Sequence, residues 1–317
     1  MVDSVDWASL EVHGAPADVP ASLHALWSPD EDKRKLGYNT LVRRLSHGGS
    51  ASLAAITAVP FLLDVVVDPG APDRFAACQV LRRIAIGEEE IILNARPDFA
   101  HLRREAQRRA SLTVEELEAE QAAWVAAALE PAERSARQTA AFLRDVEDER
   151  ETERVNADAY DAVRSGVPIY LSALSADDLA TPMYAAQLLA YFPEDASSIV
   201  PALLPLIAGP DVIVASAAAV AAGICARGTA DPAAVAAITD RRESAADRAE
   251  IWATAIALAQ LLNDPGPDIV ADVEAATEAP APLPSFPFLD GDIATVAAYT
   301  LDRLADKHTL PTGPWSS

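Results

Sequence analysis

The stretch AVPFLLDVVV, residues 58–67, places a proline in front of an apolar run, and this combination recurs along the chain. Copies follow at GVPIYLSAL (166–174) and IVPALLPLI (199–207), and a weaker one lies at DVPASLHALW (18–27). Proline fixes φ at about −65° and has no amide hydrogen, so the first turn of a helix tolerates it best. We therefore expect each Val-Pro pair to begin a helix.

Each of these helices is followed by a short turn rich in Asp, Pro, Ser or Gly, and then by an Ala-rich amphipathic stretch. The Val-Pro pairs at 19 and 59 lie 40 residues apart, and those at 167 and 200 lie 33 apart, as in two-helix repeats. Alanine lets stacked helices approach closely, so VASAAAVAAGICA (214–226) is expected to be a buried inner helix. The pattern predicts an all-α fold, a HEAT/armadillo-like superhelix of stacked helix pairs.

Residues 88–155 depart from the repeat, with 17 acids and ten arginines. We expect two or three long polar helices here, with Ser111 or Thr113 as a helix N-cap and i, i+4 pairs such as Glu133 with Arg137. This charged helical insertion is interpreted as an enlarged repeat, a lid or a binding arm. It separates N-terminal repeats (1–87) from C-terminal repeats (156–278), which precede a proline-rich linker, a capping helix and a tail (279–317).

The formal net charge of −23 is concentrated toward the C-terminus, since residues 156–317 hold 21 acids against seven Lys or Arg. Nucleic-acid binding depends on cationic side chains that neutralise phosphates, so we expect no nucleic-acid partner. No apolar run reaches the roughly 18–20 residues that span a bilayer, and the N-terminus is acidic where a signal peptide is basic. We expect a cytoplasmic chain without a membrane partner, and buried thiols at Cys78 and Cys225.

Two stretches resemble a known family. DWASLEVHGAPADVPASLHALWSPDEDKR (6–34) and LSHGGSASLAAITAVPFLLDVVVDP (45–69) are similar to HEAT-repeat-domain proteins common in actinomycetes, and AYDAVRSGVPIYLSAL (159–174) also fits. The matching residues are Trp7, Leu10, Gly14, Ala17, Asp18, Val19, Pro20, His47, Gly49, Ser50, Ala58, Val59, Pro60, Phe61 and Leu62. The resemblance implies a HEAT-like α-solenoid. It implies no particular activity, because the family has none that is agreed.

Familiar nucleotide-binding, hydrolase and zinc motifs are absent from the sequence, and the five histidines include no pair at i, i+3 or i+4. We expect no cofactor and no metal. The remaining catalytic candidates are His47 and Ser50 in RRLSHGGSASL (43–53), where an imidazole could activate a hydroxyl. The alternative interpretation is structural: Gly48 and Gly49 end one helix, Ser50 caps the next, and His47 bonds a last-turn carbonyl.

Four further residues are candidates for binding: Asp18, Arg43, Arg44 and Trp124. A polar cluster of His47 with Asp18, Arg43 or Arg44 would favour an enzyme. Trp124 is either a ligand platform or part of the apolar stripe of its helix. Asp290 and Asp292 could bind a cation, although Asp292 also fits a helix N-cap.

The function that these features favour is an interaction scaffold, which binds a protein or peptide partner through the concave face of the solenoid. An acidic surface makes a basic partner electrostatically suitable. The alternatives are an enzyme of a peptide-modifying or secondary-metabolite pathway, with its pocket in the groove, and a DNA-lesion-binding HEAT-like protein.

Overall fold

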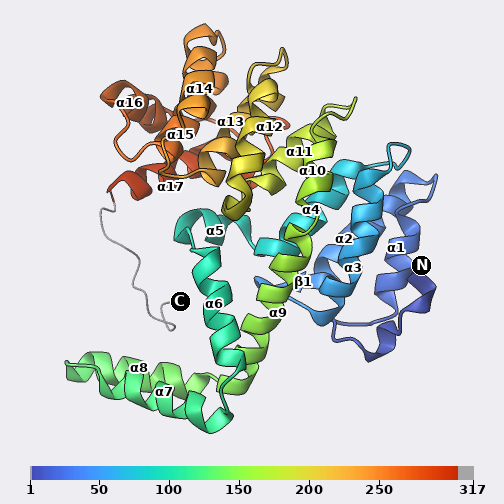
Figure 1. Ribbon diagram of the computed structural model, residues 1–317, viewed down its shortest axis with the longest axis vertical. Helices are drawn as coiled ribbons and strands as arrows, with labels where there is room; N and C mark the ends of the chain where they lie inside the picture. Colours follow the sequence, from blue (N-terminus) through green and yellow to red (C-terminus); the bar gives the residue numbers. More distant parts are fainter. Residues whose placement is uncertain (1, 306–317) are drawn as a thin grey trace.

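The computed structural model describes residues 2–305, and these residues are almost wholly helical (Figure 1). The α-helices are α1 (Asp18–Ala25), α2 (Glu31–Leu45), α3 (Leu53–Val67), α4 (Arg74–Ile86), α5 (Glu89–Ala95), α6 (Phe99–Ala110), α7 (Val114–Ala126), α8 (Pro131–Leu143), α9 (Val146–Arg164), α10 (Val167–Ala173), α11 (Ala180–Leu189), α12 (Ala196–Ile207), α13 (Val212–Cys225), α14 (Pro232–Ser244), α15 (Arg248–Leu261), α16 (Pro267–Ala276) and α17 (Ile293–Ala305). Short 3-10 turns are η1 (Val2–Ser4), η2 (Trp7–Ser9), η3 (Pro193–Asp195) and η4 (Phe288–Gly291). Two-residue strands, β1 (Ser46–His47) and β2 (Ser50–Ala51), form the one small hairpin of the described residues. The predicted all-α class is confirmed.

Consecutive helices pack in pairs. The pairs are α1/α2, α3/α4, α10/α11, α12/α13, α14/α15 and α16/α17, and they follow one another across the view of Figure 1. The second helix of each pair packs on the second helix of the next, which gives the row α2, α4, α11, α13, α15 and α17. We call this the second-helix row. Helices α4 and α11 are neighbours in it although the whole insertion lies between them in sequence.

The middle of the second-helix row is the best-packed part of the molecule. Every residue from Val214 to Cys225 in α13 is buried, as expected for the Ala-rich inner helix, and so is every residue from Trp252 to Leu261 in α15. A Cβ on Gly223 would lie 2.5 Å from the backbone oxygen of Ala257 in α15. Small side chains therefore set the close approach of these two helices.

The expectation that each Val-Pro pair begins a helix is confirmed at two of the four pairs. Val167-Pro168 begins α10, and Pro20 lies in the first turn of α1, but Pro60 and Pro201 lie inside α3 and α12. Both interior rings are exposed, and each proline leaves the carbonyl four residues earlier without its helical donor. Burial of the opposite faces of α3 and α12 offsets the lost hydrogen bond.

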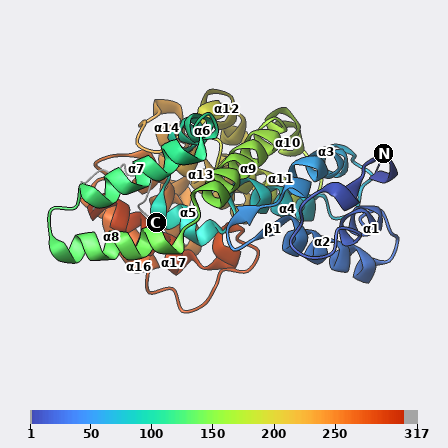
Figure 2. The ribbon, with the colours of Figure 1, turned by 90° about the horizontal axis from the view of Figure 1, so that it is seen from below.

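The insertion forms five helices, α5 to α9, rather than the expected two or three. Helix α6 packs on α9, and α9 packs on α3 and α4. Helices α7 and α8 pack mainly on each other, and Figures 1 and 2 show them projecting side by side from the body. Thr113 caps α7, with reciprocal bonds to Glu116 of 3.2 and 2.8 Å. We call residues 114–143 the arm.

The C-terminal region folds back onto the row. The proline-rich stretch 279–287 has no regular structure, and the expected capping helix is α17, whereas the tail TLPTGPWSS (309–317) lies outside the described residues. None of the helices in residues 2–305 has both the length and the apolar character that a membrane span needs.

Candidate functional site

His47 and Ser50, the catalytic candidates, face each other across the hairpin between α2 and α3. They pair between β1 and β2, and Gly48 and Gly49 form the turn with φ of 57° and 85°. A two-residue hairpin turn with positive φ at both positions suits glycine. The expected capping roles are wrong, because α2 ends before the hairpin and Ser52, not Ser50, occupies the N-cap position of α3.

Polar residues do gather near this hairpin, but not around the His47 imidazole. Arg44 donates from Nε to Asp18 Oδ2 (2.8 Å) and from Nη1 to the His13 carbonyl (3.0 Å). The exposed His47 ring lies against the His13 ring, with 5.6 Å between centroids, and Arg43 is exposed. The structure thus joins Asp18 to Arg44 and leaves His47 outside that ion pair. Its catalytic role stays a prediction.

Trp124 lies on α7, where it is half-buried against α8. The Arg137 guanidinium sits 5.0 Å from the centre of the indole ring and donates to the Trp124 carbonyl at 2.5 Å. Arg137 also pairs with Glu133 (2.6 Å), as the i, i+4 spacing predicts. The Arg137 guanidinium therefore covers one face of the ring, and a role of Trp124 in binding stays a prediction.

A buried carboxylate that the sequence analysis missed lies at the first residue of α5. Glu89 is 4% exposed and accepts hydrogen bonds from Gln187 Nε2 (2.8 Å), the Tyr191 hydroxyl (2.6 Å) and the Leu289 amide (2.9 Å). Arg82 Nη1 lies 3.7 Å from Glu89 Oε2. Glu89 stands in a run of three glutamates inside a polar insertion, so composition alone gives it no distinction from its exposed neighbour Glu90.

The Glu89 cluster ties three distant segments together. Leu289 and Asp290 adopt positive φ of 46° and 52°, which is strained for residues with side chains, and this turn presents the Leu289 amide to the carboxylate. Gln187 Nε2 also donates to the Pro287 carbonyl (2.7 Å). The start of α5 and residues 286–290 therefore lie against α11, and the chain covers part of its own second-helix row.

A polar pocket of about 240 Å³ adjoins this cluster, between the end of α4, the start of α5 and η4. Its lining includes Asp290 and Asp292. The sequence suggested two roles for these residues, a cation site or, for Asp292, a helix N-cap. Asp292 accepts from the Thr295 amide (3.0 Å) and the Thr295 hydroxyl (2.7 Å), so it is the N-cap of α17. Residues 2–305 contain no group of three acidic, histidine or cysteine side chains arranged to hold a metal ion.

Three arginines from separate parts of the sequence lie close together at the C-terminal end of the row. Arg227 donates to Gln260 Oε1 (2.9 Å), and Arg303 donates to the Leu262 carbonyl (2.7 Å). Burial, together with the charges of Arg303 and Arg96, lowers the pKa of Arg227 to about 10. Because Arg227 and Arg303 are largely buried and bonded within the chain, we interpret this cluster as structural.

The arm carries the most exposed large apolar side chains of the described residues. Leu129 and Phe142 are each 88% exposed and Leu143 is 76% exposed, and α8 has no buried residue. Ala132, Ala136, Ala140 and Leu143 of α8 recur every three or four residues, which is the spacing of one helical face, and Leu129 lies in the loop before this helix. Apolar surface gathered on a projecting element marks an interaction site.

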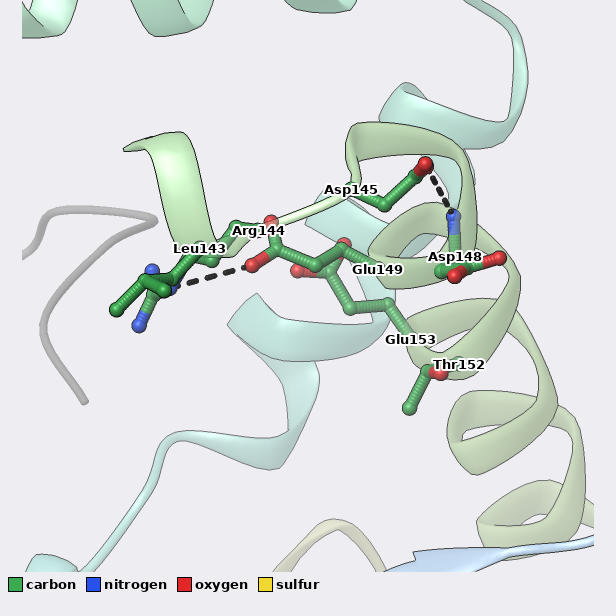
Figure 3. Close-up of a pocket in the computed structure, with 7 residues that line it drawn as sticks. All are labelled: Leu143, Arg144, Asp145, Asp148, Glu149, Thr152 and Glu153. Atoms are coloured by element: carbon green, nitrogen blue, oxygen red, sulfur yellow. Dashed lines mark hydrogen bonds and ion pairs between the residues drawn. The ribbon is translucent and has the colours of Figure 1, made fainter. Parts of the chain in front are cut away.

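An open pocket of about 490 Å³ lies where the arm joins α9 (Figure 3). Its lining residues are Leu143, Arg144, Asp145, Asp148, Glu149, Thr152 and Glu153. Arg144 Nε pairs with Glu149 Oε1 at 3.3 Å, and the fully buried Arg109 bonds Glu153 Oε1 at 2.5 Å from beneath. The exposed apolar end of α8 and an acidic hollow are thus adjacent.

The thiols offer a direct check on packing. Cys78 and Cys225 are buried, and burial raises the pKa of each thiol to about 12. At pH 8 we expect the native protein to react with a chromogenic disulfide reagent only on the timescale of unfolding, and the protein in guanidinium to react at once. The variants Cys78→Ala and Cys225→Ala assign the signal, and rapid reaction of either native thiol would contradict the packing described.

Comparison with known proteins adds no functional assignment, because neither a protein-family model nor a curated protein matches the chain.

Proposed function

We propose that the chain is a HEAT-like α-solenoid scaffold that binds a protein or peptide partner. Six helix pairs, each packed on its neighbours, support the solenoid, and they agree with the family resemblance of the first 90 residues. The sequence placed the binding surface on the concave face, and that placement stays a prediction. Burial of α13 and α15 on all sides leaves little of the second-helix row open to a partner.

The arm is the surface we assign to the partner. The observation that carries this assignment is the exposure of Phe142 and Leu143 on a helix that buries none of its residues. A chain gains nothing in stability from large apolar side chains held in water, whereas an interface gains from burying them. Helix α9, which packs on α3 and α4, anchors the arm to the repeats.

The test is retention of a partner from native lysate by the tagged full chain, followed by mass spectrometry and a titration with the purified partner. We expect Phe142→Ala/Leu143→Ala to weaken binding of the partner about 30-fold. This corresponds to a loss of about 2 kcal/mol of binding free energy, the contribution of one interface hot spot. The matched control is Leu36→Ala/Leu179→Ala, which removes leucines 63% and 62% exposed on other parts of the surface and should bind as the wild type does.

Loss of the partner in the control as well as in the arm variant would place binding elsewhere on the chain. The absence of any stoichiometric partner across lysates and salt concentrations would count against the scaffold itself.

A further inference from the structure

The pocket at the base of the arm has an excess of negative charge. Four of its lining residues are carboxylates, namely Asp145, Asp148, Glu149 and Glu153, and the guanidinium groups facing them are those of Arg144 and Arg109. Arg144 and Arg109 pair with Glu149 and Glu153, so Asp145 and Asp148 have no paired cation among residues 2–305. The Glu153 side chain is 37% exposed, and its partial burial raises the pKa of the carboxyl group.

Two oxygens in this pocket have unused hydrogen-bonding capacity. Glu149 Oε2 and Glu153 Oε2 are buried and accept no hydrogen bond from the described residues, and Arg109 Nη2 lies 3.8 Å from Glu149 Oε2. The residues stand one helical turn apart on α9, and Figure 3 shows both side chains extending into the same hollow. A buried acceptor without a donor costs about 1–3 kcal/mol, so further negative charge beside these oxygens is unfavourable unless a cation lies nearby.

The wall of the hollow that faces α8 is apolar. Leu143 lines the pocket, Phe142 precedes it, and Ala132, Ala136 and Ala140 continue the apolar stripe along α8. An occupant must therefore present a cationic group beside apolar side chains, and it must be long enough to follow a helix of 13 residues. These are the properties of an amphipathic basic helix and not of a small cation.

We propose that the base of the arm docks a basic amphipathic segment of the partner protein, which pairs its arginine side chains with Asp145 and Asp148 and lays its apolar face on Phe142 and Leu143. This proposal rests on the proposed scaffold function and names the chemistry of its partner. The forked guanidinium has five donors in one plane and can bond a carboxylate through two of them at once. A second copy of this chain is a poor occupant, since two chains of charge −23 repel each other.

The probe is a fluorescein-labelled synthetic helix of about 20 residues, with Leu at helical spacing and Arg on the flanks, and its binding to the full chain is followed by fluorescence anisotropy. A second peptide with Gln in place of Arg tests the charge. The pocket variant is Asp145→Asn/Asp148→Asn, which leaves the ion pairs of Glu149 and Glu153 with the buried Arg109 intact and keeps a side chain at residue 145 that can cap α9. The matched control is Asp240→Asn/Glu243→Gln, which removes two exposed acids of α14.

We expect the pocket variant to bind the arginine peptide at least about tenfold more weakly than the wild type, the control within about twofold, and the glutamine peptide not to bind. The circular dichroism spectrum and urea midpoint of the pocket variant should match those of the wild type, so that the loss reports the pocket. The Phe142 ring is exposed, and Phe142→Ala should weaken binding of the peptide without any change in net charge.

Equal weakening of peptide binding in the pocket variant and in the control variant would overturn the proposal, because the whole acidic surface would then attract the peptide. Displacement of the peptide by millimolar Ca²⁺ in the wild type but not in the pocket variant would also overturn it, by assigning the hollow to a metal ion. A natural partner that still binds the pocket variant would refute this proposal and leave the scaffold function standing.

Discussion

Glu89→Leu is expected to lower the free energy of unfolding by about 3–5 kcal/mol, the loss associated with breaking one side of a buried charged network. The carboxylate accepts from Gln187, Tyr191 and the Leu289 amide, and each of these donors would be left buried without that acceptor. The strained backbone at Leu289 and Asp290 would lose the contact that holds it, so the C-terminal segment should detach first.

The measurement is urea denaturation followed by tryptophan fluorescence and by far-ultraviolet circular dichroism. Glu90→Leu is the matched control, since Glu90 is exposed and bonds only the Tyr299 hydroxyl (3.1 Å) among the interactions seen, and we expect a change below about 1 kcal/mol. The stability of Glu89→Gln should lie between those of the two leucine variants, because glutamine keeps one oxygen acceptor. Equal stabilities of the two leucine variants would show that the Glu89 cluster does not hold the chain together.

Gly223→Val is expected to destabilise the protein by about 3 kcal/mol, the upper range for overpacking in a tight core. A Cβ at this position lies 2.5 Å from the Ala257 oxygen and 3.0 Å from the Ala257 Cα, and both are backbone atoms that cannot move aside singly. Helices α13 and α15 must therefore separate, and the cavities that open cost further dispersion contacts.

The control for Gly223→Val is Ala233→Val, at an exposed position of α14, where only the lower helix propensity of valine acts and the cost stays below about 0.7 kcal/mol. Thermal unfolding of both variants checks the difference. A Gly223→Val protein as stable as the wild type would mean that the two helices are farther apart than described.

Features that depend on neighbouring residues could be predicted from the sequence. Thr113 with Glu116, and Asp292 with Thr295, are local caps, and the Ala-rich stretch of α13 has a composition that suits only a buried helix. The all-helical class followed from the same kind of local signal.

Features that depend on contacts between residues far apart in the sequence could not be predicted. Pro60 marks a helix start by local chemistry, yet α3 begins at Leu53 because the burial of its inner face outweighs one lost hydrogen bond. Glu89 meets Gln187 and Leu289 across 98 and 200 residues, and nothing in its neighbourhood signals those partners. The arm pocket likewise forms from α8 and α9 only once Arg109 of α6 lies beneath them.

The most direct test of the arm as the binding surface is hydrogen–deuterium exchange of the full chain, alone and with its retained partner, resolved to peptides. We expect the partner to slow exchange in residues 129–153, at the arm and the start of α9, and to leave exchange in α11, α13 and α15 unchanged. Slowing confined to those three helices, with the arm unchanged, would contradict this expectation and return the binding site to the face of the helix row.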